Sequence, residues 1–160
     1  MRAMKPVFSV AVALSLIGLS FVVEALAAGG SNTNVMVEVL IFSGRPNPTW
    51  QLQDTNRLQA LKGKLNGLPE AFKEEPAEWS RLGFAGFRIH GGKALGLPDR
   101  IRVYRGVIQT GHGKAARHVM DIAGLEQWLI QEAKQQPLEQ PIRDVIANYE
   151  TTRKVETERR

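Results

Sequence analysis

The sequence predicts a single small α+β domain in which a mostly antiparallel sheet of about four strands packs against two or three helices. Three observations support this class. Apolar residues alternate with a period of two in several segments, and they recur at helical spacing in others. The chain has 160 residues, 43% of them hydrophobic and 23% charged, which is typical of one ordinary globular domain.

Residues 1–27 have the pattern of a secretory signal peptide. Two basic residues precede the 17-residue apolar run Val7–Val23, and the small side chains of Ala25 and Ala27 suit a signal peptidase. We expect cleavage after Ala27 and a periplasmic or secreted product with no stable membrane anchor. The alternative is an uncleaved anchor, for which the apolar run is short.

The first expected strand is Val35–Phe42, preceded by a flexible leader over 28–34. The strand leads into Gly44–Pro48, where two prolines one residue apart restrict the backbone. Arg45 and Asn47 would be held in this rigid loop with little conformational freedom, which lowers the entropic cost of using them to bind a partner. Alternatively, the loop is only a rigid connection to a second strand over 49–53.

The loop belongs to the run Phe42–Trp50, whose sequence is FSGRPNPTW. Together with LGFAGF at 82–87, IRVY at 101–104 and LEQWL at 125–129, this run resembles a family of small uncharacterised bacterial proteins. The resemblance covers most of the mature chain, and its first motif is the most specific. It implies no activity, substrate or catalytic residue, and it supports the domain boundaries and the importance of the loop.

Three amphipathic helices are predicted from apolar spacing and from capping or stop signals. The expected helices run from the cap Asp54 to Asn66, from the cap Asp121 to Lys134, and onward from about Pro141. The domain is therefore expected over residues 35–150. Residues 151–160 contain one apolar residue among charged and polar ones, which favours a disordered polar tail.

The strands expected between the first two helices are Phe84–His90, Arg100–Thr110 and, as a short further candidate, Ala115–Met120. If the first two pair, Arg88 lies near Arg102 and Tyr104 on one face of the sheet. This basic and aromatic face suits contact with an anion or a peptide. Ordinary sheet surface with cross-strand pairing is the alternative.

Metal and thiol chemistry have few candidate residues. The absence of cysteine excludes disulfides, cysteine-ligated metals and a thiol nucleophile. His90, His112 and His118 are weak metal candidates, alone or with Asp99 or Asp121, because no spacing places two of them as ligands on one helix face. Three unrelated surface histidines are the alternative.

No cofactor or nucleic acid is predicted as a partner. Gly111–Lys114 lacks the spacing of a phosphate-binding P-loop, and the chain is too short for a two-half dinucleotide fold. Without residues 1–27, the chain has 19 basic and 15 acidic residues, a net charge of +4. Nucleic-acid binders show denser basic stripes interleaved with aromatic residues.

These patterns favour an exported binding or interaction module that uses the Gly44–Pro48 loop and the basic face to hold an unidentified protein or an anionic ligand. The alternative is a small carboxylate- or histidine-dependent hydrolase, with or without a metal. A binding module predicts that Arg45, Asn47 and the strand arginines converge on one exposed patch. A hydrolase predicts that Glu38, a histidine and another acid line one concave pocket.

Overall fold

The computed structural model describes residues 34–42, 44–69 and 83–159. The predicted signal peptide, and all of the predicted leader except Asn34, lie outside the described residues. The strands are β1 (Val35–Phe42), β2 (Thr49–Leu52), β3 (Gly83–His90), β4 (Arg100–Tyr104), β5 (Val107–Thr110) and β6 (Arg117–Met120). The helices are α1 (Thr55–Leu65), α2 (Leu125–Lys134) and α3 (Gln140–Glu158), with the short 3-10 turns η1 (Gly92–Leu95) and η2 (Gly113–Ala115).

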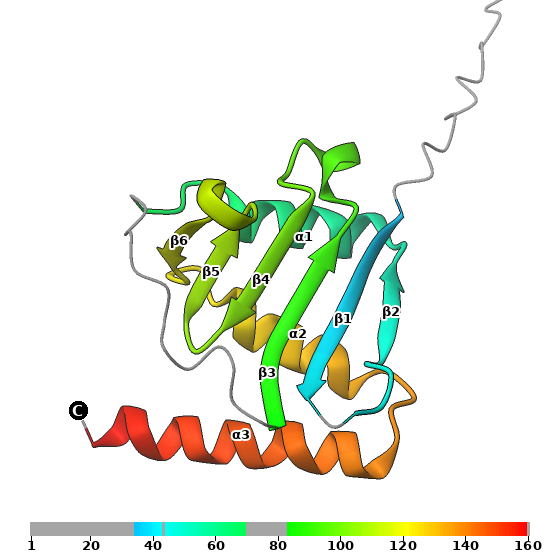
Figure 1. Ribbon diagram of the computed structural model, residues 1–160, viewed down its shortest axis with the longest axis vertical. Helices are drawn as coiled ribbons and strands as arrows, with labels where there is room; N and C mark the ends of the chain where they lie inside the picture. Colours follow the sequence, from blue (N-terminus) through cyan, green and yellow to red (C-terminus); the bar gives the residue numbers. More distant parts are fainter. Residues whose placement is uncertain (1–33, 43, 70–82, 160) are drawn as a thin grey trace, which may run out of the picture.

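One antiparallel sheet contains the strands in the order β2-β1-β3-β4-β5-β6. The predicted α+β class and the mainly antiparallel sheet are therefore confirmed, but the sheet has six strands instead of about four. Helices α1 and α2 lie against one face, whereas α3 crosses the end of the sheet at which β3 begins (Figure 1). In the described part of the chain, no helix has the length and apolar character needed to cross a membrane.

The strand predicted over 100–110 is in fact a hairpin, which corrects the strand count. Arg105 and Gly106 form its turn with φ angles of 52° and 73°. Two consecutive residues with positive φ match the right-handed twist of the strands that they join. Because the chain reverses here, Val103 lies beside Ile108 and Arg102 beside Gln109.

The core lies between the sheet and the helices α1 and α2. Alternate residues of β1 point into it, and Val35, Val37 and Val39 are fully buried. Leu61 of α1 and Leu129 of α2 are buried in the same cluster. In the described part of the chain, no helix packs along the centre of the other face of the sheet (Figure 1), so polar side chains can occupy this helix-free face.

A bulge in β3 brings two aromatic rings into one cluster. Val39 pairs with Phe87 and Ile41 pairs with Phe84, so two β3 residues lie opposite a single β1 residue. Gly86, one of the two, has a φ of 91°. In a regular strand Phe84 and Phe87 would point to opposite faces, but here their ring centroids are 5.4 Å apart and both rings are buried.

The predicted disordered tail is corrected by α3, which continues through Glu158. Composition alone did not reveal the partners of this segment. Arg105 in the β4–β5 turn donates from Nη2 to Glu156 at 2.8 Å, and Arg153 lies 4.0 Å from the Glu126 carboxylate. These contacts tie the last turns of the helix to the sheet and to α2.

The predicted cap Asp54 is confirmed, whereas the N-cap residue of α2 is Gly124 and not the predicted Asp121. The Asp54 carboxylate accepts a hydrogen bond from the Arg57 amide at 3.0 Å. Asp121 accepts from the Leu125 and Glu126 amides, both at 2.7 Å, although α2 starts only at Leu125. Each carboxylate satisfies amides that have no partner inside the helix.

Candidate functional site

A row of polar residues crosses the helix-free face of the sheet from one edge to the other. Each member is the direct cross-strand partner of the next. In strand order from β2 to β6, this polar row is Thr49, Glu38, Arg88, Arg102, Gln109 and His118. The expected placement of Arg88 and Arg102 on one face is confirmed, since these two residues are Cα partners.

Glu38 is the centre of a hydrogen-bonded cluster on this row. Its carboxylate accepts from Asn47 Nδ2 at 2.7 Å and from Arg88 Nη1 at 3.0 Å, and it lies 3.3 Å from His90 Nε2. Burial alone would raise the pKa of Glu38, but the hydrogen bonds from Asn47 and His90 and the charge of Arg88 outweigh it and hold the pKa below its usual value. Glu38 is therefore an ionised anchor at neutral pH and a poor proton donor.

Asn47 joins the rigid loop to this cluster. Besides donating to Glu38, it accepts a hydrogen bond from the Ile41 amide through Oδ1 at 3.0 Å. The backbone helps as well, because the Val39 amide donates to the Pro48 carbonyl at 2.9 Å. Asn47 thus acts as a brace between the loop and β1, and among the described residues its side-chain contacts connect it to Arg88 through Glu38.

A recess of about 150 Å³ lies over the arginines of the row, where β3, β4 and β5 approach η2. Among the described residues, its lining contains no carboxylate. It is lined by Arg88, Arg100, Arg102, Gln109, Gly111, His112 and Gly113. We call it the arginine recess.

The strands that form the arginine recess are strongly basic. Residues 83–120, which span β3 to β6, contain seven Lys and Arg residues but only one acidic residue, Asp99. Of the arginines that line the recess, Arg88 has Glu38 as its carboxylate partner. A surface of this kind attracts anions over distances of about 8 to 10 Å at physiological ionic strength.

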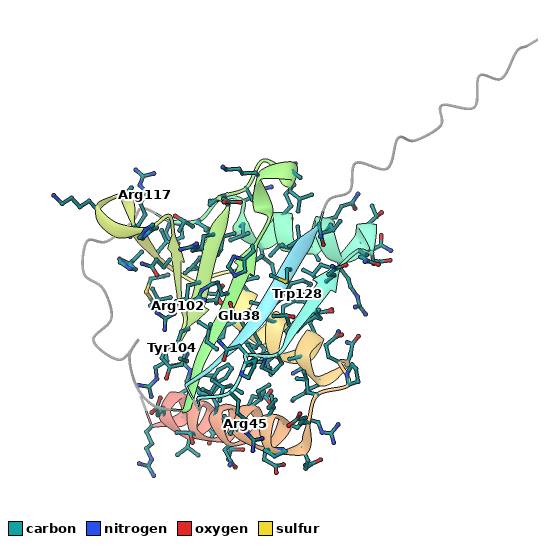
Figure 2. The ribbon with its side chains drawn as sticks, turned by 45° about the vertical axis from the view of Figure 1, so that its right-hand side comes forward. Glu38, Arg45, Arg102, Tyr104, Arg117 and Trp128 are labelled. Atoms are coloured by element: carbon teal, nitrogen blue, oxygen red, sulfur yellow. The ribbon has the colours of Figure 1, made fainter. Side chains whose placement is uncertain are left out.

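Arg45 and Tyr104 do not join the arginine recess. Arg45 is exposed and points toward Glu139, 3.9 Å away, near the start of α3 (Figure 2). Tyr104 is buried, and its ring stacks on that of Tyr149 with centroids 5.7 Å apart. The predicted convergence of Arg45 with the strand arginines is therefore wrong, and Tyr104 is a packing residue at the α3 end of the sheet.

The arrangement expected for a hydrolase is not assembled in the described residues. Glu38 lies beside His90, but the contacts found for its carboxylate are with Asn47, Arg88 and His90, with no second acid among them. The metal candidates are not gathered either. Within residues 34–42, 44–69 and 83–159, no three His, Asp or Glu side chains form a group that could hold a metal ion.

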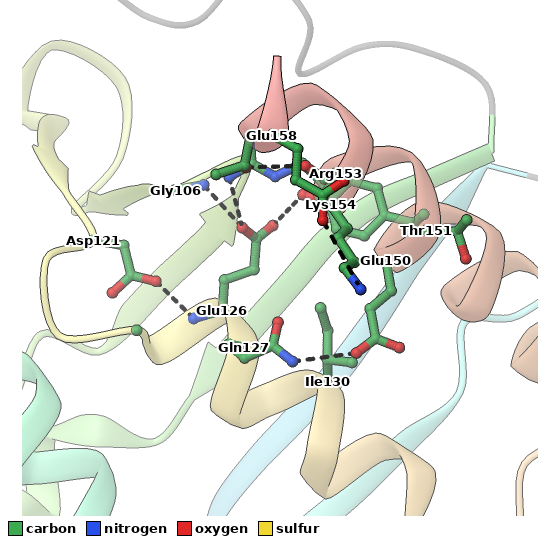
Figure 3. Close-up of a pocket in the computed structure, with 13 residues that line it drawn as sticks. Gly106, Asp121, Glu126, Gln127, Ile130, Glu150, Thr151, Arg153, Lys154 and Glu158 are labelled. Atoms are coloured by element: carbon green, nitrogen blue, oxygen red, sulfur yellow. Dashed lines mark hydrogen bonds and ion pairs between the residues drawn. The ribbon is translucent and has the colours of Figure 1, made fainter. Parts of the chain in front are cut away.

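A larger cavity, of about 680 Å³, is lined mainly by residues of α2 and α3 (Figure 3). The carboxylates of Glu126 and Glu150 in its lining already have partners. Glu126 accepts from the Arg105 and Gly106 amides at 2.7 and 2.9 Å and from the Tyr149 hydroxyl at 2.6 Å, while Glu150 pairs with Lys134 at 2.6 Å. Because these carboxylates already have partners, this cavity is less suited than the arginine recess to recognise a charged ligand.

Sequence patterns did not single out Gln109 or Glu126. The signal for Gln109 was the Arg105-Gly106 pair, because a two-residue turn there places Gln109 beside Arg102. Glu126 is a buried acidic residue of α2, where most of the other buried residues are apolar. Its partners are separated from it by 20 or more residues, so spacing could not reveal them.

Comparisons with protein-family models, with curated proteins and with solved structures found no match. The family resemblance of the FSGRPNPTW motif therefore stays a prediction.

Proposed function

We propose that this protein is an exported binding module that holds an anionic ligand or partner on the helix-free face of its sheet. The observation that carries the proposal is the arginine recess, which brings three guanidinium groups from β3 and β4 together with Gln109 and His112. Guanidinium groups are the preferred partners of carboxylates and phosphates in proteins because their donors form a planar fork.

Two further features support binding. The Glu38 cluster fixes Arg88 before any ligand arrives, which reduces the entropic cost of using that side chain. The polar row lies on a rigid antiparallel sheet, and rigid elements position binding groups more precisely than mobile loops.

The test is a nuclear magnetic resonance titration of the processed protein with inorganic phosphate, citrate and hexaglutamate at low ionic strength. We expect saturable shifts at Arg88, Arg102 and Gln109 with at least one of these anions, reversed by added salt. Arg102→Gln should weaken binding by about 1.5 to 3 kcal/mol, the usual worth of a hydrogen bond to a charged group. Arg143→Gln, on the exposed surface of α3, is the matched control. If none of the three anions shifts the sheet face, the proposal is wrong.

Export is proposed from the N-terminal sequence: a basic start, the apolar run Val7–Val23 and the small residues Ala25 and Ala27. Mass spectrometry of the protein recovered from the cell envelope tests it. A chain that begins at Ala28 is expected, and a full-length chain in the membrane fraction would favour the uncleaved anchor.

A further inference from the structure

We propose that the arginine recess selects a phosphate group, free or carried as a monoester, over a carboxylate. This inference rests on the proposed function, that the sheet face binds anions, and it names the chemical class of the anion.

The size of the recess matches a compact group. Its volume of about 150 Å³ corresponds to roughly five water molecules at about 30 Å³ each. This space accepts one tetrahedral oxyanion and its bridging atom. An extended acidic chain would have to lie mainly outside it.

The donors that line the recess exceed what a carboxylate can use. A guanidinium group has five N–H donors and no acceptor. Glu38 accepts from Arg88 Nη1, and the Ala85 carbonyl oxygen accepts from Arg102 Nη2 at 3.5 Å, while Arg100 and the Gln109 amide add further donors to the lining. A carboxylate offers two oxygens and one negative charge. A phosphate monoester offers three terminal oxygens and a charge of about −1.5 to −2 at neutral pH, so it engages more of the lining at once.

The arrangement of the arginines also suits a tetrahedral group. Arg88 and Arg102 are direct cross-strand partners, and Arg100 lies two residues before Arg102 on the same face of β4. The three side chains therefore rise from a triangle of positions on the sheet, not from one line. They can approach three oxygens of a tetrahedron from different sides, which a planar carboxylate does not offer.

Glu38 acts here as a positioning residue. It accepts one hydrogen bond from Arg88 Nη1 at 3.0 Å, and it is itself held by Asn47 at 2.7 Å. Within residues 34–42, 44–69 and 83–159, the hydrogen bond found for the Arg88 guanidinium is the one to Glu38, so its other N–H groups can face a ligand. Glu38→Gln should therefore weaken phosphate binding through loss of the Arg88 orientation, although Glu38 itself is an anion.

The experiment compares two probes with the same aromatic ring, phenyl phosphate and benzoate, by calorimetry and chemical-shift mapping on the processed protein. We expect one phenyl phosphate per chain, bound at least about tenfold more tightly than benzoate, with the shifts centred on the recess. Inorganic phosphate separates the two sources of the group, because tighter binding of phenyl phosphate indicates a monoester and equal binding indicates the free anion.

Arg100→Gln is the critical variant because Arg100 is exposed, so its replacement does not threaten the fold. It should weaken phenyl phosphate at least about tenfold, whereas Arg143→Gln on α3 should leave binding unchanged. Equal affinity for benzoate would overturn phosphate selectivity and leave the proposed function standing. Unchanged binding by Arg100→Gln would exclude the recess as the site. If no anion binds at all, both proposals fall.

Discussion

Replacement of Glu126 by Gln is expected to destabilise the protein by about 3 kcal/mol, the low end of the cost of breaking a buried charged network. The buried Glu126 carboxylate accepts from two consecutive amides of the β4–β5 turn and from the Tyr149 hydroxyl. Glutamine has the same shape, but its amide nitrogen is a donor and would face another donor. The adjacent cavity of about 680 Å³ is large enough for water to reach this site, and we therefore expect a loss near the low end.

The β4–β5 turn that Glu126 contacts has a strained backbone. Arg105 is the one residue other than glycine with positive φ in the described chain, a conformation that costs an L-residue roughly 1 kcal/mol or more. The hydrogen bonds from Arg105 and Gly106 to Glu126 offset this strain and fix the turn. Loss of the carboxylate therefore removes the interaction and leaves the strain in place.

Urea unfolding followed by tryptophan fluorescence measures the free energy of unfolding. A double-mutant cycle with Tyr149→Phe should give a coupling energy of about 1 kcal/mol or more, because the two side chains share a hydrogen bond. Glu150→Gln is the control: it removes a more exposed ion pair with Lys134 and should cost about 1 kcal/mol or less. A loss below about 1 kcal/mol for Glu126→Gln, or no coupling to Tyr149, would refute this account of the turn.

Three further perturbations, two substitutions with matched controls and one change of pH, have definite expected outcomes. Gly86→Ala should lower the free energy of unfolding in urea by about 3 kcal/mol or more, since φ is 91° and an added Cβ would lie 2.1 Å from the Val103 carbonyl oxygen. The control Gly63→Ala, at an exposed position of α1 with open space around it, should instead stabilise the protein by about 0.5 to 1 kcal/mol. A larger loss for Gly63→Ala than for Gly86→Ala would contradict the bulge in β3. Asn47→Ala should lower the free energy of unfolding by about 1 to 3 kcal/mol and raise the pKa of Glu38, which carboxyl NMR measures. The control Arg45→Ala loses an exposed ion pair of 3.9 Å and should change the free energy of unfolding by less than about 0.5 kcal/mol. The pKa of Tyr149 is raised by burial and by the charge and hydrogen bond of Glu126, so the contribution of Tyr149 to stability is complete below the ordinary pKa of 10.0 and is lost as pH rises beyond it. A tyrosinate absorbance titration in a Tyr104→Phe background should show Tyr149 titrating above pH 10.0. Titration at the ordinary value would contradict the contact between Tyr149 and Glu126.

The local elements of this fold could be predicted from the sequence because their signals are local. The signals are the alternation of apolar residues in β1, the Asp54 cap of α1 and the apolar spacing of α2. Each depends on residues that are close together in the sequence. The Arg88 and Arg102 pair was also within reach, since it needed only that β3 and β4 pair and that both residues lie on the polar face.

The remaining features depend on residues far apart in the chain. The end of α3 looked like a disordered tail because the partners of Arg153 and Glu156 lie in α2 and in the β4–β5 turn. Asn47 was read as a binding group of the loop, yet its partners are Glu38 and the Ile41 amide in β1. In both cases the structure of the segment depends on a hydrogen-bond or ion-pair partner in another element. The spacing of residues within the segment does not reveal that partner.

The β4–β5 turn links the stability of the fold to the candidate site. A shift of one residue in this hairpin would move Gln109 to the other face of the sheet and away from Arg102. Glu126 accepts hydrogen bonds from both amides of the turn, and we expect these bonds to help fix the register in which the polar row forms. A Glu126→Gln protein that stays folded should therefore bind phenyl phosphate more weakly, although Glu126 lies in the other cavity and never touches the recess. Binding that remains unchanged in that variant would show that the strands hold their register without the hydrogen bonds to the Glu126 carboxylate.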